Sequence, residues 1–359
     1  MTDEVVSKKV SIGADDVPPK PEKSVKVQVV QHPPNADSSD DEKDEEEQEE
    51  PDVDDAEILE NLPDDTEEID LIHSKLSALG RLGLARFTKL KKLCLRQNYI
   101  AKLEADDFAA LEALEELDLY DNRLKRVGDA LDKLKNLNVL DLSFNNIKHV
   151  PPSISLLENL RTVYFVQNKI SHITGFGPTS QSLRSLELGG NRIRRIEGLE
   201  TLVNLEELWL GKNKITRLEN LESLTKLKIL SIQSNRIEKL EGLETLESLE
   251  EFYISHNGIK KLEGLGKNSK LRTLDVGNNF ISELENISHL MELEELWISN
   301  NQLSTIQNIE AELKNVTTLE TIYLEGNPLQ AKEGAHYRRK MILALPQLKQ
   351  LDATYIRVT

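Results

Sequence analysis

Residues 205–215 read Leu-Glu-Glu-Leu-Trp-Leu-Gly-Lys-Asn-Lys-Ile, and this arrangement recurs along most of the chain. The general unit is L-x-x-L-x-L-x-x-N-x-[IL], and it occurs eleven times from Leu90 onward. Successive units are 24, 23, 23, 23, 22, 22, 22, 22, 22 and 26 residues apart, counted on Asn98, Asn122, Asn145, Asn168, Asn191, Asn213, Asn235, Asn257, Asn279, Asn301 and Asn327. A degenerate unit, Ile69 to Leu76, stands one period earlier, with Ser74 in place of asparagine. Such a period predicts a solenoid of stacked units.

The segment x-L-x-L-x in each unit alternates as a short strand with one buried face does. One unit cannot bury its leucines alone, so stacked units form a continuous core beneath a parallel sheet. Each asparagine follows a strand, where its amide can bond backbone groups and stack into a ladder. A period of 22 leaves little room for the return, so 3₁₀ or extended turns are expected on the convex side. The predicted fold is an α/β solenoid, a leucine-rich-repeat horseshoe with a parallel concave sheet.

The C-terminal end needs a cap, because the last repeat would otherwise expose its leucines. Residues 330–345 predict a helix that Pro346 ends, with Tyr337, Met341, Ile342 and Leu345 on the apolar face and Arg338, Arg339 and Lys340 facing water. Leu348, Leu351 and Ile356 would complete the core. The expected organisation is therefore a tail over 1–65, about twelve repeat units over 66–329 and a C-terminal helical cap over 330–359.

The net charge of −18 comes from one region of the 359-residue chain. Residues 37–70 hold 20 acids and one base, whereas 71–359 hold 38 acids and 39 bases. Such a density of like charge with little apolar surface predicts disorder over residues 1–65. The near-neutral folded part gives no reason to expect a nucleic-acid surface. With one cysteine, no signal-peptide pattern and no long apolar stretch, the chain is expected in a reducing compartment without membrane spans.

The residues between the buried leucines point outward and would form the concave surface. The middle one of each unit reads, in order, Cys94, Asp118, Asp141, Tyr164, Glu187, Trp209, Ser231, Tyr253, Asp275, Trp297 and Tyr323. Five of these eleven are aromatic in a chain with 4% aromatic residues, and both tryptophans of the chain are among them. A column two residues earlier adds four glutamates, namely Glu116, Glu207, Glu251 and Glu295.

Exposed tryptophan and tyrosine are enriched at interface hot spots, and carboxylates around them favour a basic, partly apolar partner. The alternative is that the rings only stack along neighbouring strands and stabilise the sheet. Catalysis has no support: the seven histidines are scattered without metal-ligand spacing or a paired nucleophile. Cys94 is interpreted as a packing residue. No cofactor and no metal are expected.

Several stretches give a more specific resemblance. They include Leu93-Cys-Leu-Arg-Gln-Asn98, Leu117-Asp-Leu-Tyr-Asp-Asn122, Leu208-Trp-Leu-Gly-Lys-Asn213, and Tyr323-Leu-Glu-Gly-Asn-Pro328 followed by Tyr337-Arg-Arg-Lys. Over roughly residues 66–359 the chain resembles the family of the leucine-rich-repeat regulatory subunit 7 of protein phosphatase 1. The resemblance implies that the concave face binds the catalytic subunit of this Ser/Thr phosphatase, with a further inhibitor subunit in a ternary complex.

Family contact residues fall on the outward columns of this sequence. The resemblance implies contacts for Asp141, Glu187, Asp275, Glu295, Trp297 and Tyr323, which have matching residue types. Tyr164 and Trp209 stand where the family usually has phenylalanine. Together with Asp118 and Tyr253 from the outward column, these residues make up the predicted partner-binding site. A location in nucleus and cytoplasm is also implied.

Two other functions remain open at this point. An acidic repeat protein could bind basic clients such as histones, because acidic surfaces attract them. An activator of GTPases with a catalytic arginine is the third class, although repeats of such activators are longer and more helical than 22 residues allows. We predict a non-catalytic regulatory subunit that controls the phosphatase's activity, maturation or targeting.

Overall fold

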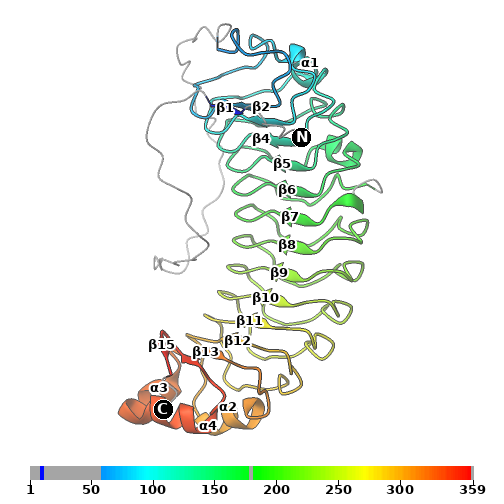
Figure 1. The fold of residues 1–359 in the computed structure, drawn as a ribbon. Coiled ribbons are helices and arrows are strands. Elements are labelled where there is room, and N and C mark those ends of the chain that lie inside the picture. Colours follow the sequence, from blue (N-terminus) through cyan, green and yellow to red (C-terminus); the bar gives the residue numbers. More distant parts are fainter. Residues whose placement is uncertain (1–8, 12–57, 178–180, 357–359) are drawn as a thin grey trace, which may run out of the picture.

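The computed structural model describes residues 9–11, 58–177 and 181–356. Its strands stack into one 15-stranded sheet whose spatial order follows the sequence (Figure 1). The strands are β1 Lys9–Ser11, β2 Glu68–Asp70, β3 Lys92–Cys94, β4 Glu116–Asp118, β5 Val139–Asp141, β6 Thr162–Tyr164, β7 Ser185–Glu187, β8 Glu207–Trp209, β9 Ile229–Ser231, β10 Glu251–Tyr253, β11 Thr273–Asp275, β12 Glu295–Trp297, β13 Thr321–Tyr323, β14 Gln350–Leu351 and β15 Thr354–Tyr355. Neighbouring strands pair in parallel from β1 to β14, and β15 turns back antiparallel to β14. The predicted leucine-rich-repeat solenoid is confirmed.

In each strand the central residue faces the interior, and the residues on either side of it point to the outer face. In β8, Leu208 is buried while Glu207 and Trp209 are half-buried on the outer face. The buried residues of successive units join into one hydrophobic core that runs from Leu59 to Leu351. The degenerate first unit forms β2, with Ile69 buried between its two outward residues. The outward columns on the sheet are therefore set by the alternation that the sequence predicted.

The predicted asparagine ladder is present. In one unit, Oδ1 of Asn213 accepts a hydrogen bond from the backbone N–H of Ile193 at 3.0 Å. Its Nδ2 donates to the carbonyl of Leu188 in the preceding unit at 2.9 Å and to that of Leu210 in its own at 3.0 Å. Each asparagine thus ties two units together at the point where the chain leaves the sheet.

The convex side consists mostly of turns, as the short period predicted. It includes the 3₁₀ segments η2 Leu84–Arg86 and η3 Pro152–Leu156 and the single-turn helix α1 Ala105–Phe108. A longer helix, α2 Ile306–Leu313, forms in the unit that ends at Asn327. That unit has 26 residues rather than 22, so it has room for two helical turns on the return.

The C-terminal cap differs from the predicted single helix. It consists of α3 Pro328–Glu333, η5 Gly334–His336 and α4 Tyr337–Ala344, with the break at Gly334, whose φ is 53°. Figure 1 shows these helices gathered at one end of the stack. Tyr337 and Met341 are buried as predicted. Arg338 was expected to face water, and this is wrong: its guanidinium donates to the carbonyls of Leu351, Thr354 and Tyr355.

Asp352 ends the ladder in place of an asparagine. Its Oδ1 accepts from the backbone N–H of Leu324 at 2.8 Å, and its Oδ2 accepts from the Tyr337 hydroxyl at 3.0 Å. The cap therefore satisfies the last strand with backbone and side-chain partners instead of leaving it open.

The predicted disordered tail over 1–65 falls largely on residues 1–8 and 12–57, which lie outside the described residues. The described part of that range shows more order than expected. Lys9–Ser11 forms β1 beside β2, and Leu59 is buried while its carbonyl accepts from Arg86 at 2.5 Å. The packed unit therefore begins several residues before position 66.

Candidate protein-binding surface

The C-terminal half of the concave sheet carries a continuous ribbon of four aromatic side chains, Trp209, Tyr253, Trp297 and Tyr323. The Trp209 and Tyr253 ring centroids are 6.4 Å apart with planes 18° from parallel. Tyr253 and Trp297 are 6.1 Å apart and meet edge to face, as do Trp297 and Tyr323 at 5.9 Å. We call these four residues the ring ribbon.

The first three rings of the ribbon come from alternate strands rather than neighbouring ones. Ser231 in β9 lies between Trp209 and Tyr253, and Asp275 in β11 lies between Tyr253 and Trp297. Two strand spacings amount to about 9.6 Å, so rings 6.1–6.4 Å apart lean toward each other over the shorter side chain. Ser231 and Asp275 are correspondingly buried, at 4% and 8% exposure. Small residues in the intervening strands therefore allow the ribbon to close.

Carboxylates on the same strands hold the polar ends of the rings. The Tyr253 hydroxyl donates to Glu251 at 2.7 Å, and Nε1 of Trp297 donates to Glu295 at 3.0 Å. Burial, followed by the bond to Glu251, raises the pKa of Tyr253 above its ordinary value. Nε2 of Gln350 donates to the Tyr323 hydroxyl at 2.7 Å. All four rings are half-buried, so each retains an apolar surface that a partner could cover, and in Tyr253, Trp297 and Tyr323 the polar end already has a hydrogen-bond partner.

The N-terminal half of the sheet is acidic. Asp118, Asp141 and Glu187 occupy the same outward column in β4, β5 and β7, with Tyr164 between the last two. Burial is the main cause that raises the pKa of Glu187, and the nearby charges of Asp141 and Glu207 add to it. These carboxylates repel one another, so a cationic partner would relieve their charge.

A cluster beside the acidic half was not predicted. Arg96 forms an ion pair with Asp118 at 3.1 Å and lies 4.1 Å above the Tyr120 ring. The Tyr120 ring is in turn 4.9 Å from that of Phe144, which is 42% exposed. These residues stand two or three positions after the strand column, at the turn, so alternation along the strand could not assign their direction.

All ten predicted site residues lie at outward strand positions, and nine of them are half-buried on the face. Asp275 differs, because it is buried. Its Oδ1 accepts from the backbone N–H of Gly277 at 3.0 Å, as Oδ1 of Asp118 does from Tyr120 and Oδ1 of Asp141 from Ser143. The Asp275 carboxylate thus supports the turn beneath the rings and offers a partner little free surface. Cys94 is also in the column, and burial raises the pKa of its thiol to about 11. Such a thiol stays protonated, which agrees with a packing role.

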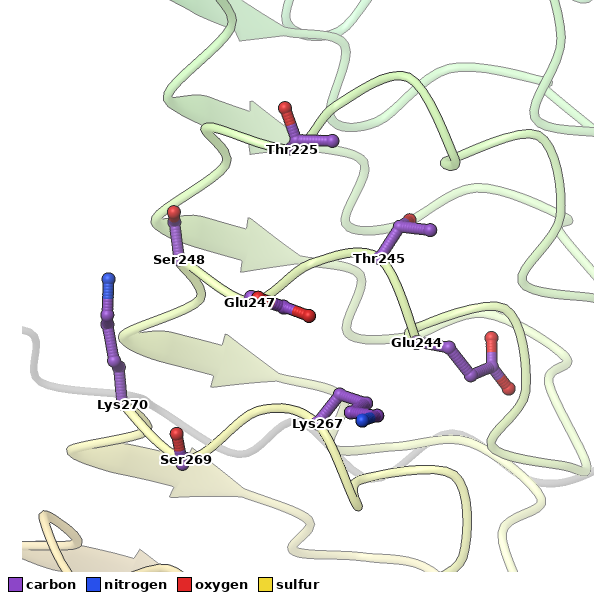
Figure 2. Close-up of a pocket in the computed structure, with 8 residues that line it drawn as sticks. All are labelled: Thr225, Glu244, Thr245, Glu247, Ser248, Lys267, Ser269 and Lys270. Carbon is purple, nitrogen blue, oxygen red and sulfur yellow. The ribbon is translucent and has the colours of Figure 1, made fainter.

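A shallow hollow lies on the other side of the solenoid, where the chain approaches the strands (Figure 2). It has a volume of about 490 Å³ and is lined by Thr225, Glu244, Thr245, Glu247, Ser248, Lys267, Ser269 and Lys270. Its lining balances two acids against two lysines and provides neither histidine nor cysteine. This lining gives no nucleophile with a paired base.

Within residues 9–11, 58–177 and 181–356, no group of three or more His, Cys, Asp and Glu side chains is arranged to hold a metal ion. None of the described helices has the length and apolar content to cross a bilayer.

Sequence profiles of leucine-rich-repeat families match most of the repeat region. The profile described as "Leucine-rich repeat" matches residues 233–359, another matches 66–124, and the two-copy profile matches 112–152, 181–223 and 203–245. The chain is a leucine-rich-repeat protein. An internalin from Listeria monocytogenes shares its fold, with a TM-score of 0.64 and 22% identity over 84% of this chain and 94% of that one. Leucine-rich-repeat domains are generally non-catalytic and serve as protein-binding scaffolds.

Two curated relatives share higher identity with this leucine-rich-repeat protein over short stretches. Protein phosphatase 1 regulatory subunit SDS22 of Saccharomyces cerevisiae is 48% identical over 71 residues, which is 20% of this chain and 21% of the relative. Protein phosphatase 1 regulatory subunit 7 of Danio rerio is 61% identical over 46 residues, or 13% of each chain. The matched part thus spans about a fifth or less of these relatives, so the chain has partial similarity to phosphatase regulators.

Proposed function

We propose that this protein is a non-catalytic regulatory subunit that binds the catalytic subunit of protein phosphatase 1. The single observation that carries the proposal is the ring ribbon, with three of its rings bonded to neighbouring polar groups and its apolar faces half-buried. Large aromatic side chains clustered on a preformed surface provide most of the energy at protein interfaces. The partial similarity to phosphatase regulatory subunits supports the choice of partner.

The two halves of the concave face would contribute differently to this binding. The ring ribbon would be the hot spot that holds the partner once it has docked. Asp118, Asp141 and Glu187 would attract a basic patch of the partner and speed its approach, an effect that salt weakens. Binding in this way would control the phosphatase's activity, maturation or targeting in the nucleus and cytoplasm, and leaves room for a further inhibitor subunit.

Binding of the purified catalytic subunit to the immobilised protein tests the proposal. Trp209→Ala combined with Trp297→Ala should weaken binding by about 100-fold, because each lost ring costs on the order of 1–2 kcal/mol. Met291→Ala is the matched control, since Met291 is 53% exposed in a turn away from the sheet. The control should bind as the unchanged protein does.

The melting temperature separates this reading from the stacking alternative. If the rings serve the partner, the double variant should melt within a few degrees of the unchanged protein. A large drop in melting temperature with binding retained would show that the rings only stabilise the sheet. Equal binding of histones and of the phosphatase, both lost in the double variant, would favour an acidic repeat protein for basic clients.

A further inference from the structure

The turns that directly follow the strands form one side of the solenoid. This side carries a row of cations, although the net charge of the folded part is close to zero. After each ladder asparagine the chain continues x-[IL]-x, and the isoleucine or leucine is buried, so the flanking residues point outward. In four successive units, these two positions and the one before the asparagine hold six cations and a single acid, Glu238. The cations are Lys169, Arg192, Arg194, Lys212, Lys214 and Arg236. We call these six residues the basic flank.

The backbone places four of these cations directly in register. The amide N–H of Lys169 donates to Ile147 O at 2.9 Å, and that of Arg192 donates to Ile170 O at 2.8 Å. Lys214 and Arg236 repeat the same bond, each to the unit before it, at 2.8 Å. One strand spacing of about 4.8 Å therefore separates successive members of the row. Cations so close repel one another unless an anion lies across them.

In the row of residues next to the basic flank, the cations form ion pairs with carboxylates. Arg195 pairs with Glu219 at 3.1 Å, and Arg217 pairs with Glu241 at 3.1 Å, each reaching the following unit. By contrast, among the residues that the structure describes, no carboxylate lies within 4.0 Å of a basic-flank side chain. The carboxylates of the described units therefore form ion pairs with the cations of the adjacent row and not with the six cations of the basic flank.

We propose that the basic flank binds the acidic segment 37–57 of this same chain. That segment holds 14 acids and one lysine, and it includes the run Asp44-Glu45-Glu46-Glu47. The row from Lys169 to Arg236 covers three strand spacings, about 14 Å, which four or five extended residues span. Charge and length both fit.

The connection to the solenoid makes this contact possible within one molecule. Ten residues lie between Glu47 and Ile58, where the packed units begin, and the eleven steps from Glu47 to Ile58 extend to about 36 Å. The flank begins at β6, four strand spacings or about 19 Å from β2 along the stack. A tether of this kind raises the effective concentration of the segment to the millimolar range. Weak individual ion pairs are then sufficient to hold it.

An acidic peptide fits better than nucleic acid. Proteins that bind single strands combine positive charge with aromatic rings on which bases stack. In the four units, the positions one before, one after and three after the asparagine hold no Phe, Tyr or Trp side chain. The paired glutamates of the adjacent row and the acidic half of the sheet would also repel a polymer with one phosphate at every nucleotide.

Carbodiimide cross-linking of the full chain at low protein concentration, read by mass spectrometry, tests the proposal. This reagent joins carboxylates to lysine amines in direct contact, so Lys169, Lys212 and Lys214 report on the flank. Acids of 37–57 should couple to these three lysines in preference to the exposed Lys267 and Lys270 of the hollow (Figure 2). Raising NaCl from 0.1 to 1 M should reduce the coupling about fivefold or more, because the screening length falls from about 10 to 3 Å.

Charge reversal of the arginines provides the decisive variant. Arg192→Glu, Arg194→Glu and Arg236→Glu leave all three reporter lysines in place and should reduce their coupling about fivefold or more. The control Lys226→Glu, Lys267→Glu, Lys270→Glu makes the same change in net charge on the opposite side and should leave it within about twofold. Melting temperatures confirm that both variants fold.

Three results would overturn the proposal. Coupling spread over lysines in proportion to their exposure, or unchanged by the arginine reversals, would show that the flank has no preference for the segment. Coupling found only between two copies, and lost on dilution, would place the contact between molecules. Binding of a fluorescent DNA or RNA oligonucleotide that the reversals abolish, without any coupling of 37–57, would show that the flank is a nucleic-acid surface.

Discussion

The two halves of the concave sheet have the same backbone and different surfaces. From β3 to β7 the outward column holds Asp118, Asp141 and Glu187, whose like charges lie near one another. From β8 to β13 it holds the ring ribbon. The leucines and asparagines beneath are the same in both halves. The fold fixes the inward residues in both halves and places only local demands on the outward ones, such as the backbone N–H groups that donate to Asp118, Asp141 and Asp275. Under the proposed function, the charged half and the aromatic half would contribute differently to binding.

The largest expected effect tests whether the scaffold is equally strong under both halves. Asn122→Ala under the acidic half and Asn257→Ala under the ring ribbon each remove an amide with hydrogen bonds to two units. Each should destabilise the protein by about 3 kcal/mol, because buried backbone groups lose their partners. Urea unfolding measures both. A difference of more than about 1 kcal/mol would show that one half depends on the ladder more than the other.

The junction of the halves provides a second test of the scaffold. Gly198 lies in the turn between β7 and β8 with φ at +68°, and a Cβ there would lie 2.3 Å from the carbonyl oxygen of Ile173. Gly198→Ala should cost about 2 kcal/mol, since it combines a left-handed backbone with a clash against main chain. Gly128→Ala has the same backbone conformation with no atom within 4 Å, so it should cost about half as much. Thermal unfolding of the two variants separates the clash from the conformation.

The sequence was sufficient for the scaffold because period and alternation determine it. The units, the buried leucines, the ladder and the outward column all follow from spacing. Spacing could not show that Trp209 and Tyr253 meet above Ser231, because this depends on how two rings lean across an intervening strand. Nor could it show that Asp275 is buried or that Arg338 binds the cap. The basic flank was missed because a regional net charge averages over sides of the solenoid that only the stacking separates.

The two halves of the concave sheet are expected to differ most clearly in how they affect the association and dissociation rates of the partner. Under the proposed function, Trp297→Ala should weaken binding of the phosphatase catalytic subunit by about 2 kcal/mol, mainly through faster dissociation. Asp141→Asn should weaken it by less than about 1 kcal/mol, mainly through slower association, and the difference should vanish in high salt. Surface plasmon resonance at two salt concentrations resolves both rates. If Asp141→Asn instead raised the dissociation rate as Trp297→Ala does, the acidic half would be part of the hot spot.

The smallest expected effect is on the stability of the protein without a partner, which the carboxylates of the acidic half reduce. Burial and the charges of Asp141 and Glu207 raise the pKa of Glu187 in the folded state above its ordinary value. The folded state therefore binds the Glu187 proton more tightly than the unfolded state, so this group destabilises the fold at neutral pH and the penalty disappears as the pH falls through the raised pKa. Glu187→Gln should raise stability at pH 7 by less than about 1 kcal/mol, since solvent screens the partly exposed carboxylate. It should have no effect near pH 3, where the glutamate is already protonated in both states.

Unfolding curves at the two pH values test this effect of Glu187→Gln, and Glu325→Gln, at an exposed position after β13, is the control. Equal gains at both pH values would mean that Glu187 acts through packing, and the acidic half would then carry no electrostatic strain for a partner to relieve.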